Sequence, residues 1–251
     1  MRLERSTWVQ AEEYLKKRDI VLLAVGSIEC HGRHNALGTD TLIPNRLLEL
    51  IEEKSDVMIL PTLPYGNADW HTGFPGTITI GPDLLYQTVK TICTQMYRWG
   101  IRKFVILNGH GGNTASLERV AGDLDQMGGI AAILNWWTMV WDMNPAWKGG
   151  HGGGEETAGL LAIDENLVDK TEIGDAGLKH LSKNLVSTGF RSVSYKGVSI
   201  LIPRTSRKVV ENGWFGIDHP KEATVQWGKE MLQTAADYIV DFLGEFENLT
   251  L

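Results

Sequence analysis

The chain has 251 residues, of which 43% are hydrophobic and 22% charged, and its formal net charge is -7 at pH 7. This composition is typical of a folded globular protein and argues against a disordered chain. The negative charge excludes nucleic-acid binding as the main task, because neutralising phosphates needs a surplus of lysine and arginine. The length suits one large domain, which we expect over residues 1–251.

The N-terminal residues and the cysteines indicate the cellular compartment of the protein. Two cysteines, Cys30 and Cys93, are too few for the disulfide framework of a small secreted domain. The first residues carry charges and lack the apolar segment of a signal peptide. No apolar run reaches the roughly 20 residues that span a bilayer. We therefore expect a cytoplasmic protein with no membrane partner.

Apolar runs and amphipathic stretches alternate along the first two thirds of the chain. The sequence predicts helices over 8–17, 41–54, 83–100, 114–128, 155–163 (a helix start) and 220–246. It predicts strands over 20–27, 57–66, 77–80, 103–109, 130–137 and 197–203. Such alternation indicates a mostly parallel sheet with helices on both faces, and ligands of such sheets bind at the carboxyl ends of the strands.

The first candidate site follows the strand predicted at 20–27. Glu29 and His31 alternate along an extended chain, so both can point to one side, and Asp40 returns after a short loop. Carboxylates and imidazoles are ligands of Zn²⁺, Mn²⁺ and Fe²⁺. A polar surface loop would contain the same residue types, so both interpretations stay open. The same alternation points Cys30 away, and we expect it to be buried and passive.

The second candidate site is glycine-rich and lies between a predicted strand and a predicted helix. It contains His110, which stands at the usual ligand position of an open α/β sheet. We also expect Asn108, just before it, to contact substrate. The alternative is a turn that binds phosphate at the helix N-terminus. That alternative is weaker, because neither G-x-G-x-x-G nor a P-loop Lys-Ser/Thr pair is present.

The third candidate site is His151 followed by three glycines and two glutamates. A histidine before a flexible glycine run suits a group that transfers protons. Glu155 and Glu156 begin the next predicted helix, where the helix dipole favours acidic side chains without any catalytic role. The helix dipole accounts for an acidic residue at this position, but it does not account for the presence of His151. We therefore expect His151 to be catalytic.

Aromatic side chains cluster just before His151. Four of them fall within a dozen residues: Trp136, Trp137, Trp141 and Trp147. Large aromatics lie more often in a core than in a pocket, but the glycine, proline and asparagine around them suit an ordered loop over a site. We expect Trp137 to bind substrate. His71, in a second aromatic segment, is either another substrate contact or a structural histidine.

The motifs together resemble those of the creatininase (creatinine amidohydrolase) family. That family's first motif is roughly G-S-x-E-Q-H-G-x-H-L-P-L-G-T-D, and residues 26–40 are G-S-I-E-C-H-G-R-H-N-A-L-G-T-D. Further segments match in the same order, at 74–77, 108–113, 151–157 and 213–220. The similarity spans about residues 8–240.

The resemblance implies an α/β/α sandwich, a homo-oligomer that is often a hexamer, and two divalent metal ions (Zn, Mn or Fe) per subunit. Glu29, Asp40 and His110 would hold one ion. His31 and Asp40 would hold the other, with Asp40 bridging the two. His151 matches the family's catalytic histidine, and Glu156 matches the acidic residue five places on, so the resemblance implies that both are catalytic.

The chain departs from creatininase at one ligand position. Creatininase has tyrosine and glutamate where this sequence has Gly111 and Gly112. The second ion would therefore take Glu156 or water instead.

The expected activity is hydrolysis of a C–N bond in a small cyclic amide or formamide by a metal-activated water. One alternative, also drawn from the family, is hydrolytic C–C ring opening of a cyclic polyol diketone, as in a 3-dehydro-scyllo-inosose hydrolase. The other is a non-catalytic module that binds a metal or phosphate. Such a module would need no proton transfer by His151.

Overall fold

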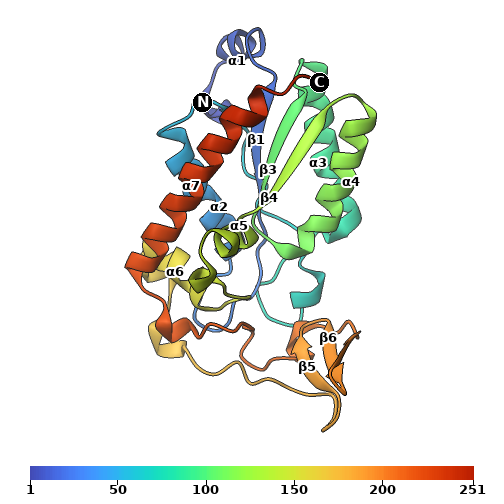
Figure 1. The fold of residues 1–251 in the computed structure, drawn as a ribbon, viewed down its shortest axis with the longest axis vertical. Helices are drawn as coiled ribbons and strands as arrows, with labels where there is room; N and C mark the ends of the chain where they lie inside the picture. Colours follow the sequence, from blue (N-terminus) through green and yellow to red (C-terminus); the bar gives the residue numbers. More distant parts are fainter.

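Four parallel strands form the central sheet of the computed structural model, which describes residues 1–251 (Figure 1). They are β1 (Ile20–Val25), β2 (Met58–Ile59), β3 (Lys103–Asn108) and β4 (Ile130–Asn135). Their order across the sheet is β2-β1-β3-β4, and every neighbouring pair is parallel. The predicted parallel sheet is thus confirmed.

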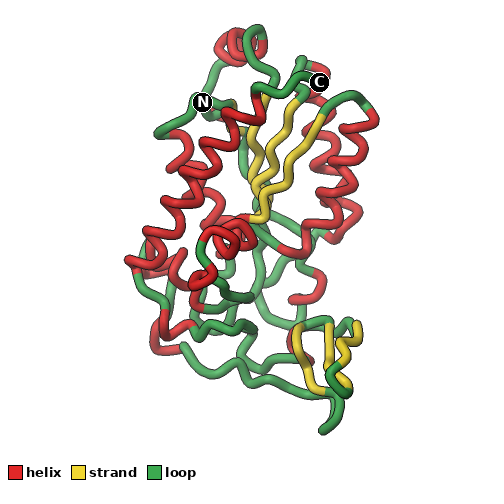
Figure 2. Tube along the Cα trace, in the orientation of Figure 1, coloured by secondary structure: helices red, strands yellow, loops and turns green.

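Helices cover both faces of this sheet, which confirms the three-layer α/β/α arrangement (Figures 1 and 2). The helices are α1 (Trp8–Leu15), α2 (Thr39–Glu52), α3 (Gly81–Arg98), α4 (Thr114–Gln126), α5 (Trp136–Met143), α6 (Gly154–Ile163) and α7 (Val225–Glu247). Side chains of α2, α5 and α7 pack on one face, and those of α3 and α4 on the other. None of the helices combines the length and apolarity needed to cross a bilayer.

The continuous apolar run of β1 is explained by the two cores. Leu22 and Ala24 belong to the core shared with α2 and α7, whereas Leu23 and Val25 belong to the core shared with α3 and α4. Successive side chains of a strand point to opposite faces, so a strand covered on both faces needs apolar residues throughout. Full burial of one such leucine or valine stabilises the fold by about 1.5–3 kcal/mol.

Several predicted boundaries differ from the structure, and the strand at 57–66 is the largest difference. Only Met58–Ile59 form β2, although Leu60 and Leu63 still donate to the carbonyls of β1. Pro61 and Pro64 have no N–H group, so a regular ladder cannot continue through this stretch. The strand predicted at 77–80 is also wrong, since only Ile78 forms an isolated bridge, to Ile28.

Two helix starts near the candidate site differ from the sequence prediction, and helix α5 was not predicted. Helix α2 begins at Thr39 rather than residue 41, which places Asp40 in its first turn instead of in a loop. Strand β4 ends at Asn135, and Trp136 begins helix α5 instead of extending the strand to residue 137. Both shifts bring side chains of the candidate site onto the rigid ends of helices.

A second, small antiparallel sheet lies away from the main one, at the lower right of Figure 1. Its strands are β5 (Val186–Gly189), β6 (Ser192–Tyr195) and β7 (Val198–Leu201). The strand predicted at 197–203 corresponds to β7, whereas β5 and β6 were not predicted. Phe190 and Arg191 form the turn between β5 and β6.

The strand order fixes where a ligand can bind. The chain runs outward from β1 to β2 on one side and from β3 to β4 on the other, so direction switches between β1 and β3. Ligands of open α/β sheets bind in the crevice at this switch. Helix α2 comes very close to Gly109 at this switch. A Cβ on Gly109 would lie 1.9 Å from the carbonyl oxygen of Asp40 and 2.8 Å from Cγ of Pro44.

We expect Gly109→Ala to destabilise the fold by about 1–3 kcal/mol, because the clashing atom is a backbone oxygen that cannot rotate away. Gly111→Ala is the matched control, since its nearest neighbour would lie 3.9 Å away, at Trp137. The control should change stability by less than about 0.5 kcal/mol. Urea unfolding midpoints measure both, and equal midpoints would show that the close approach is not maintained in solution.

Candidate metal centre

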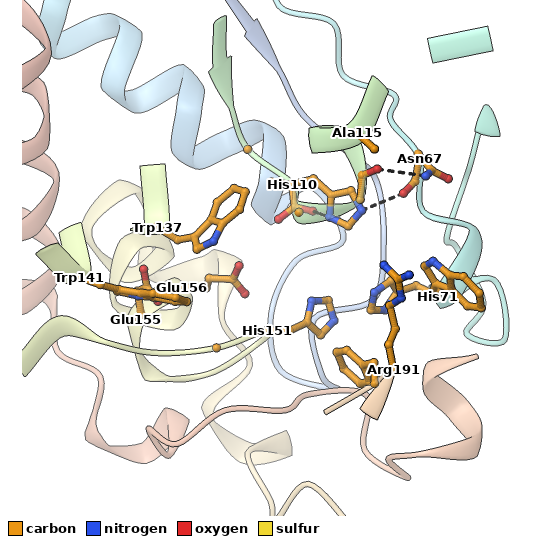
Figure 3. Close-up of a pocket in the computed structure, with 17 residues that line it drawn as sticks. Asn67, His71, His110, Ala115, Trp137, Trp141, His151, Glu155, Glu156 and Arg191 are labelled. Atoms are coloured by element: carbon orange, nitrogen blue, oxygen red, sulfur yellow. Dashed lines mark hydrogen bonds and ion pairs between the residues drawn. The ribbon is translucent and has the colours of Figure 1, made fainter. Parts of the chain in front are cut away.

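Acidic and imidazole side chains converge at the switch point of the sheet (Figure 3). Glu29 and His31 lie in the loop after β1, and His110 follows β3. Asp40 and Glu156 come from the first turns of α2 and α6. The structure thus brings together all five side chains expected to ligate metal, from four separate parts of the chain.

The ligand atoms form three groups: two share Asp40, and a third joins Glu29 and His31 to His151. In the first, His110 Nδ1 lies 3.0 Å from Asp40 Oδ2, and His110 Nε2 lies 3.1 Å from Glu29 Oε2. In the second, His31 Nε2 lies 2.9 Å from Asp40 Oδ1 and 3.5 Å from Glu156 Oε2. Within each group the candidate ligand atoms all lie within 4.8 Å of one another.

Several of these close atoms form no hydrogen bond. His31 Nε2, Asp40 Oδ2 and Glu29 Oε1 are all buried and have no hydrogen-bonding partner. A buried polar atom without a partner costs about 1–3 kcal/mol. Ligands that bind an ion at 2.0–2.2 Å in a tetrahedron lie about 3.3–3.6 Å apart. The donor set therefore fits a divalent ion, which would satisfy atoms that the protein leaves unpaired.

Backbone carbonyls orient both histidines. Nδ1 of His31 lies 3.1 Å from the carbonyl oxygen of Glu29, and Nε2 of His110 lies 2.9 Å from that of Asn67. An N–H donated to each carbonyl leaves the other ring nitrogen free, as metal-ligating histidines require. The two free nitrogens both face the carboxylate of Asp40.

The crowded charges perturb the protonation of the cluster. Burial lowers the pKa of His31, but the negative charges of Asp40 and Glu156 outweigh it and raise that pKa to about 10. Burial raises the pKa of Glu156 to about 7, with His31 opposing. Protons therefore occupy the cluster when no cation does, and a divalent ion would displace them on binding.

His151 lies outside the two groups that share Asp40 and forms the third group with Glu29 and His31. Its Nδ1 lies 3.7 Å from Glu29 Oε1, and its ring centroid lies 4.4 Å from that of His31 and 4.3 Å from that of His71. Its Nε2 is buried and has no partner. Burial lowers the pKa of His151 well below its ordinary value, so the ring is neutral at pH 7 and able to accept a proton.

A tight turn holds His151 in place. Gly152 has φ +66°, and a Cβ on it would lie 2.8 Å from the backbone carbon of His31. Its N–H donates to Oε2 of Glu156 over 2.6 Å. The glycines after His151 therefore permit a close backbone approach that a larger residue would prevent.

A cavity of about 390 Å³ opens beside these side chains. Trp137 and His71 line it, together with Trp141 and Trp70. Figure 3 shows Trp137 and Trp141 on one side and His71 on the other. The sequence analysis missed further lining residues, among them Asn67, Phe190 and Arg191.

Two other residues named from the sequence lie outside the cavity. Asn108 is 0% exposed, because it ends a strand covered on both faces, so it cannot contact a substrate as we expected. Its Oδ1 instead accepts from the backbone N–H of His110, and its Nδ2 donates to Oδ1 of Asn135. Cys30 is buried as expected, and burial raises its pKa to about 11.

Comparison with known proteins agrees with this geometry. Residues 4–243 match the creatininase family, described as creatinine amidohydrolase. The chain belongs to the creatininase family. Its relatives in that family make it a hydrolase.

Three relatives illustrate the range of the family. The chain is 30% identical to creatinine amidohydrolase of Pseudomonas putida over 197 residues, 67% of this chain and 74% of that one. It is 33% identical to the mycofactocin precursor peptide peptidase of Mycolicibacterium smegmatis, over 71% and 73% of the two chains. A 3-dehydro-scyllo-inosose hydrolase of Thermotoga maritima is 29% identical over 54% of this chain and 45% of its own.

Solved creatininases share the fold over nearly the whole chain. A mutant creatininase of Zn-Zn type superposes with a TM-score of 0.76 and 23% identity, covering 99% of this chain and 98% of the other. A creatininase with Mn gives a TM-score of 0.77 and 23% identity, covering 99% of each chain. At this identity the superposition establishes the creatininase fold alone.

The creatininase motif also contains a buried neutral histidine whose protonation we expect to destabilise the protein. Nε2 of His34 lies 3.1 Å from the carbonyl oxygen of Gly152, and burial lowers its pKa to about 4. The unfolded chain has an ordinary histidine pKa of about 6.5. The neutral ring thus stabilises the fold fully above about pH 6.5, and this contribution is lost as pH falls towards 4.

Between pH 7 and pH 5 the protein should therefore lose about 2 kcal/mol more stability than His34→Gln, which keeps a donor but cannot titrate. Urea unfolding of both proteins with chelator at the two pH values measures the difference. Equal losses would show that His34 is not neutral and buried in the folded state.

Proposed function

We propose that this protein is a metal-dependent amidohydrolase that uses water to cleave a C–N bond of a small amide. The observation behind the proposal is that two groups of ligand atoms share one carboxylate, Asp40, at the bottom of the cavity. The creatinine amidohydrolase and the peptidase, both named for cleaving amide bonds, match about three quarters of their own length.

We assign one ion to Glu29, Asp40 and His110, and a second to His31, Asp40 and Glu156. A carboxylate and imidazole set of this kind accepts Zn²⁺, Mn²⁺ and Fe²⁺. Solved creatininases of Zn-Zn and Mn type favour the first two. A divalent ion held by these residues would lower the pKa of a coordinated water from about 15.7 towards about 7, so it would supply hydroxide at neutral pH.

The protein's own residues would then move the proton and hold the substrate. His151 is neutral and open to the cavity, so it can take a proton from the attacking water and give it to the leaving nitrogen. Glu156 keeps His151 in place through the N–H of Gly152. Trp137 and Trp141 offer flat apolar faces that would pack on the substrate and exclude water.

The size of the cavity supports a small substrate, such as a cyclic amide or a formamide. Hydrolytic C–C ring opening has weaker support, because the inosose hydrolase matches less than half of its own length. A non-catalytic module has no use for a neutral histidine with a free Nε2 beside the ligands.

Two substitutions should separate metal binding from chemistry. Asp40→Ala removes the carboxylate shared by both groups, so we expect loss of bound metal and of activity together. His151→Gln removes the proton carrier, so metal should stay while the rate of hydrolysis falls by about 10²–10⁴-fold. Metal content per subunit and rates on creatinine, formamides, short peptides and an inosose, with and without chelator, measure these effects.

His180→Ala is the control, because this histidine is exposed and lies outside the cluster. It should keep both metal and activity. An Asp40→Ala protein with normal metal content and turnover would contradict the assignment of the centre. If the protein hydrolysed only the inosose, the proposed C–N cleavage would be wrong and its reaction would be C–C cleavage.

A further inference from the structure

We propose that the substrate carries a carboxylate, and that Arg191 binds it at the mouth of the cavity. This inference rests on the proposed hydrolase function and adds a substrate class to it. Arg191 is the one lysine or arginine among the 17 residues that line the cavity. It comes from the small sheet, outside every motif of the metal centre.

The charges around the cavity make this arginine unusual. The other ionisable groups in the lining are acids and histidines, among them Asp40, Glu155 and Glu156. Yet Arg191 forms no ion pair with any of them, and its guanidinium lies 5.6 Å from the ring centroid of Trp70. Its positive charge is therefore free to meet an anion from solution.

The turn that presents Arg191 is held by aromatic packing. The ring of Phe190 lies edge-on to His71 and His151, with 5.2 Å between centroids in each case. It also contacts Phe215, at 5.6 Å. Edge-on packing of aromatic rings is favourable beyond the apolar area that it buries. Phe190 thus fixes the hairpin tip over the catalytic histidine and keeps Arg191 at the opening.

The guanidinium of Arg191 limits the chemical class of ligand that can bind beside it. A guanidinium is planar and offers parallel N–H donors that match a carboxylate, and an aromatic face beside it limits its motion. Arg191 and His71 stand at one side of the cavity, and Trp137 and Trp141 at the other (Figure 3). A substrate whose amide reaches the metal ligands can therefore place a carboxylate on Arg191, whereas an uncharged or cationic amide gains nothing there.

The test measures binding rather than turnover. Hydroxamates bind divalent ions, so monohydroxamates of malonic, succinic and glutaric acid probe the metal centre with a carboxylate at three distances. Each is paired with its primary-amide analogue, which has the same size and no charge. Dissociation constants are measured by calorimetry on the metal-loaded protein and on Arg191→Gln, Arg191→Lys and Arg207→Gln.

In the wild type we expect at least one carboxylate to bind about tenfold tighter than its amide partner. Arg191→Gln should reduce that preference to within about twofold and leave the amide's affinity unchanged, which also shows that the variant is folded. Arg191→Lys should keep part of it. Arg207→Gln should keep all of it, because Arg207 packs over Phe74 outside the cavity lining.

The outcomes separate the two proposals. If the neutral hydroxamates bind only with metal present but show no carboxylate preference, or a preference that Arg191→Gln retains, this inference is overturned and the metal centre stands. If neither member of any pair binds the metal-loaded protein, the proposed function fails and takes this inference with it.

Discussion

The approach of helix α2 to the ends of β1 and β3 determines the rest of the site. The carbonyl of Asp40 sits where only a glycine, Gly109, leaves room, and Thr41 Oγ1 donates to the carbonyl of Ser27 in the loop after β1. These contacts place the Asp40 carboxylate between His31 and His110. Both cores of the protein support this junction, because α2 packs on one face of β1 while α3 and α4 pack on the other.

The electrostatic consequence of this junction is a cluster that needs positive charge. Three carboxylates, Glu29, Asp40 and Glu156, lie within a few ångströms of one another and are largely removed from water. Burying carboxylate oxygens without partners is costly. Ser27 Oγ donates to Glu29 and the N–H of Gly152 donates to Glu156, but Glu29 Oε1 and Asp40 Oδ2 have no hydrogen-bonding partner. A divalent cation resolves the conflict, whereas a cluster selected only for stability would use apolar side chains or well-aligned hydrogen bonds.

The sequence predicted those features that depend on local pattern. Strands β1 and β3 follow from apolar runs, and alternation correctly placed Glu29 and His31 on the side opposite Cys30. Prediction from the sequence failed where contacts between distant parts of the chain decide the role of a residue. The position of Asn108 at the end of a strand suggested a residue of the pocket. Both faces of β3 are covered, however, and Asn108 is buried. Nothing near Phe190 indicates that it meets His71, because about 120 residues separate them and only the folded chain brings them together.

The candidate metal ligands and the proposed carboxylate contact, Arg191, thus come from different parts of this structure. The candidate ligands stand on strand ends and helix starts that are packed into the two cores, so most changes there would disturb folding as well as metal binding. The hairpin of β5 and β6 supplies no candidate ligand, and most of its residues are at least partly exposed. Substitution of Arg191, which is exposed at its tip, can therefore alter the cavity lining at little cost in stability.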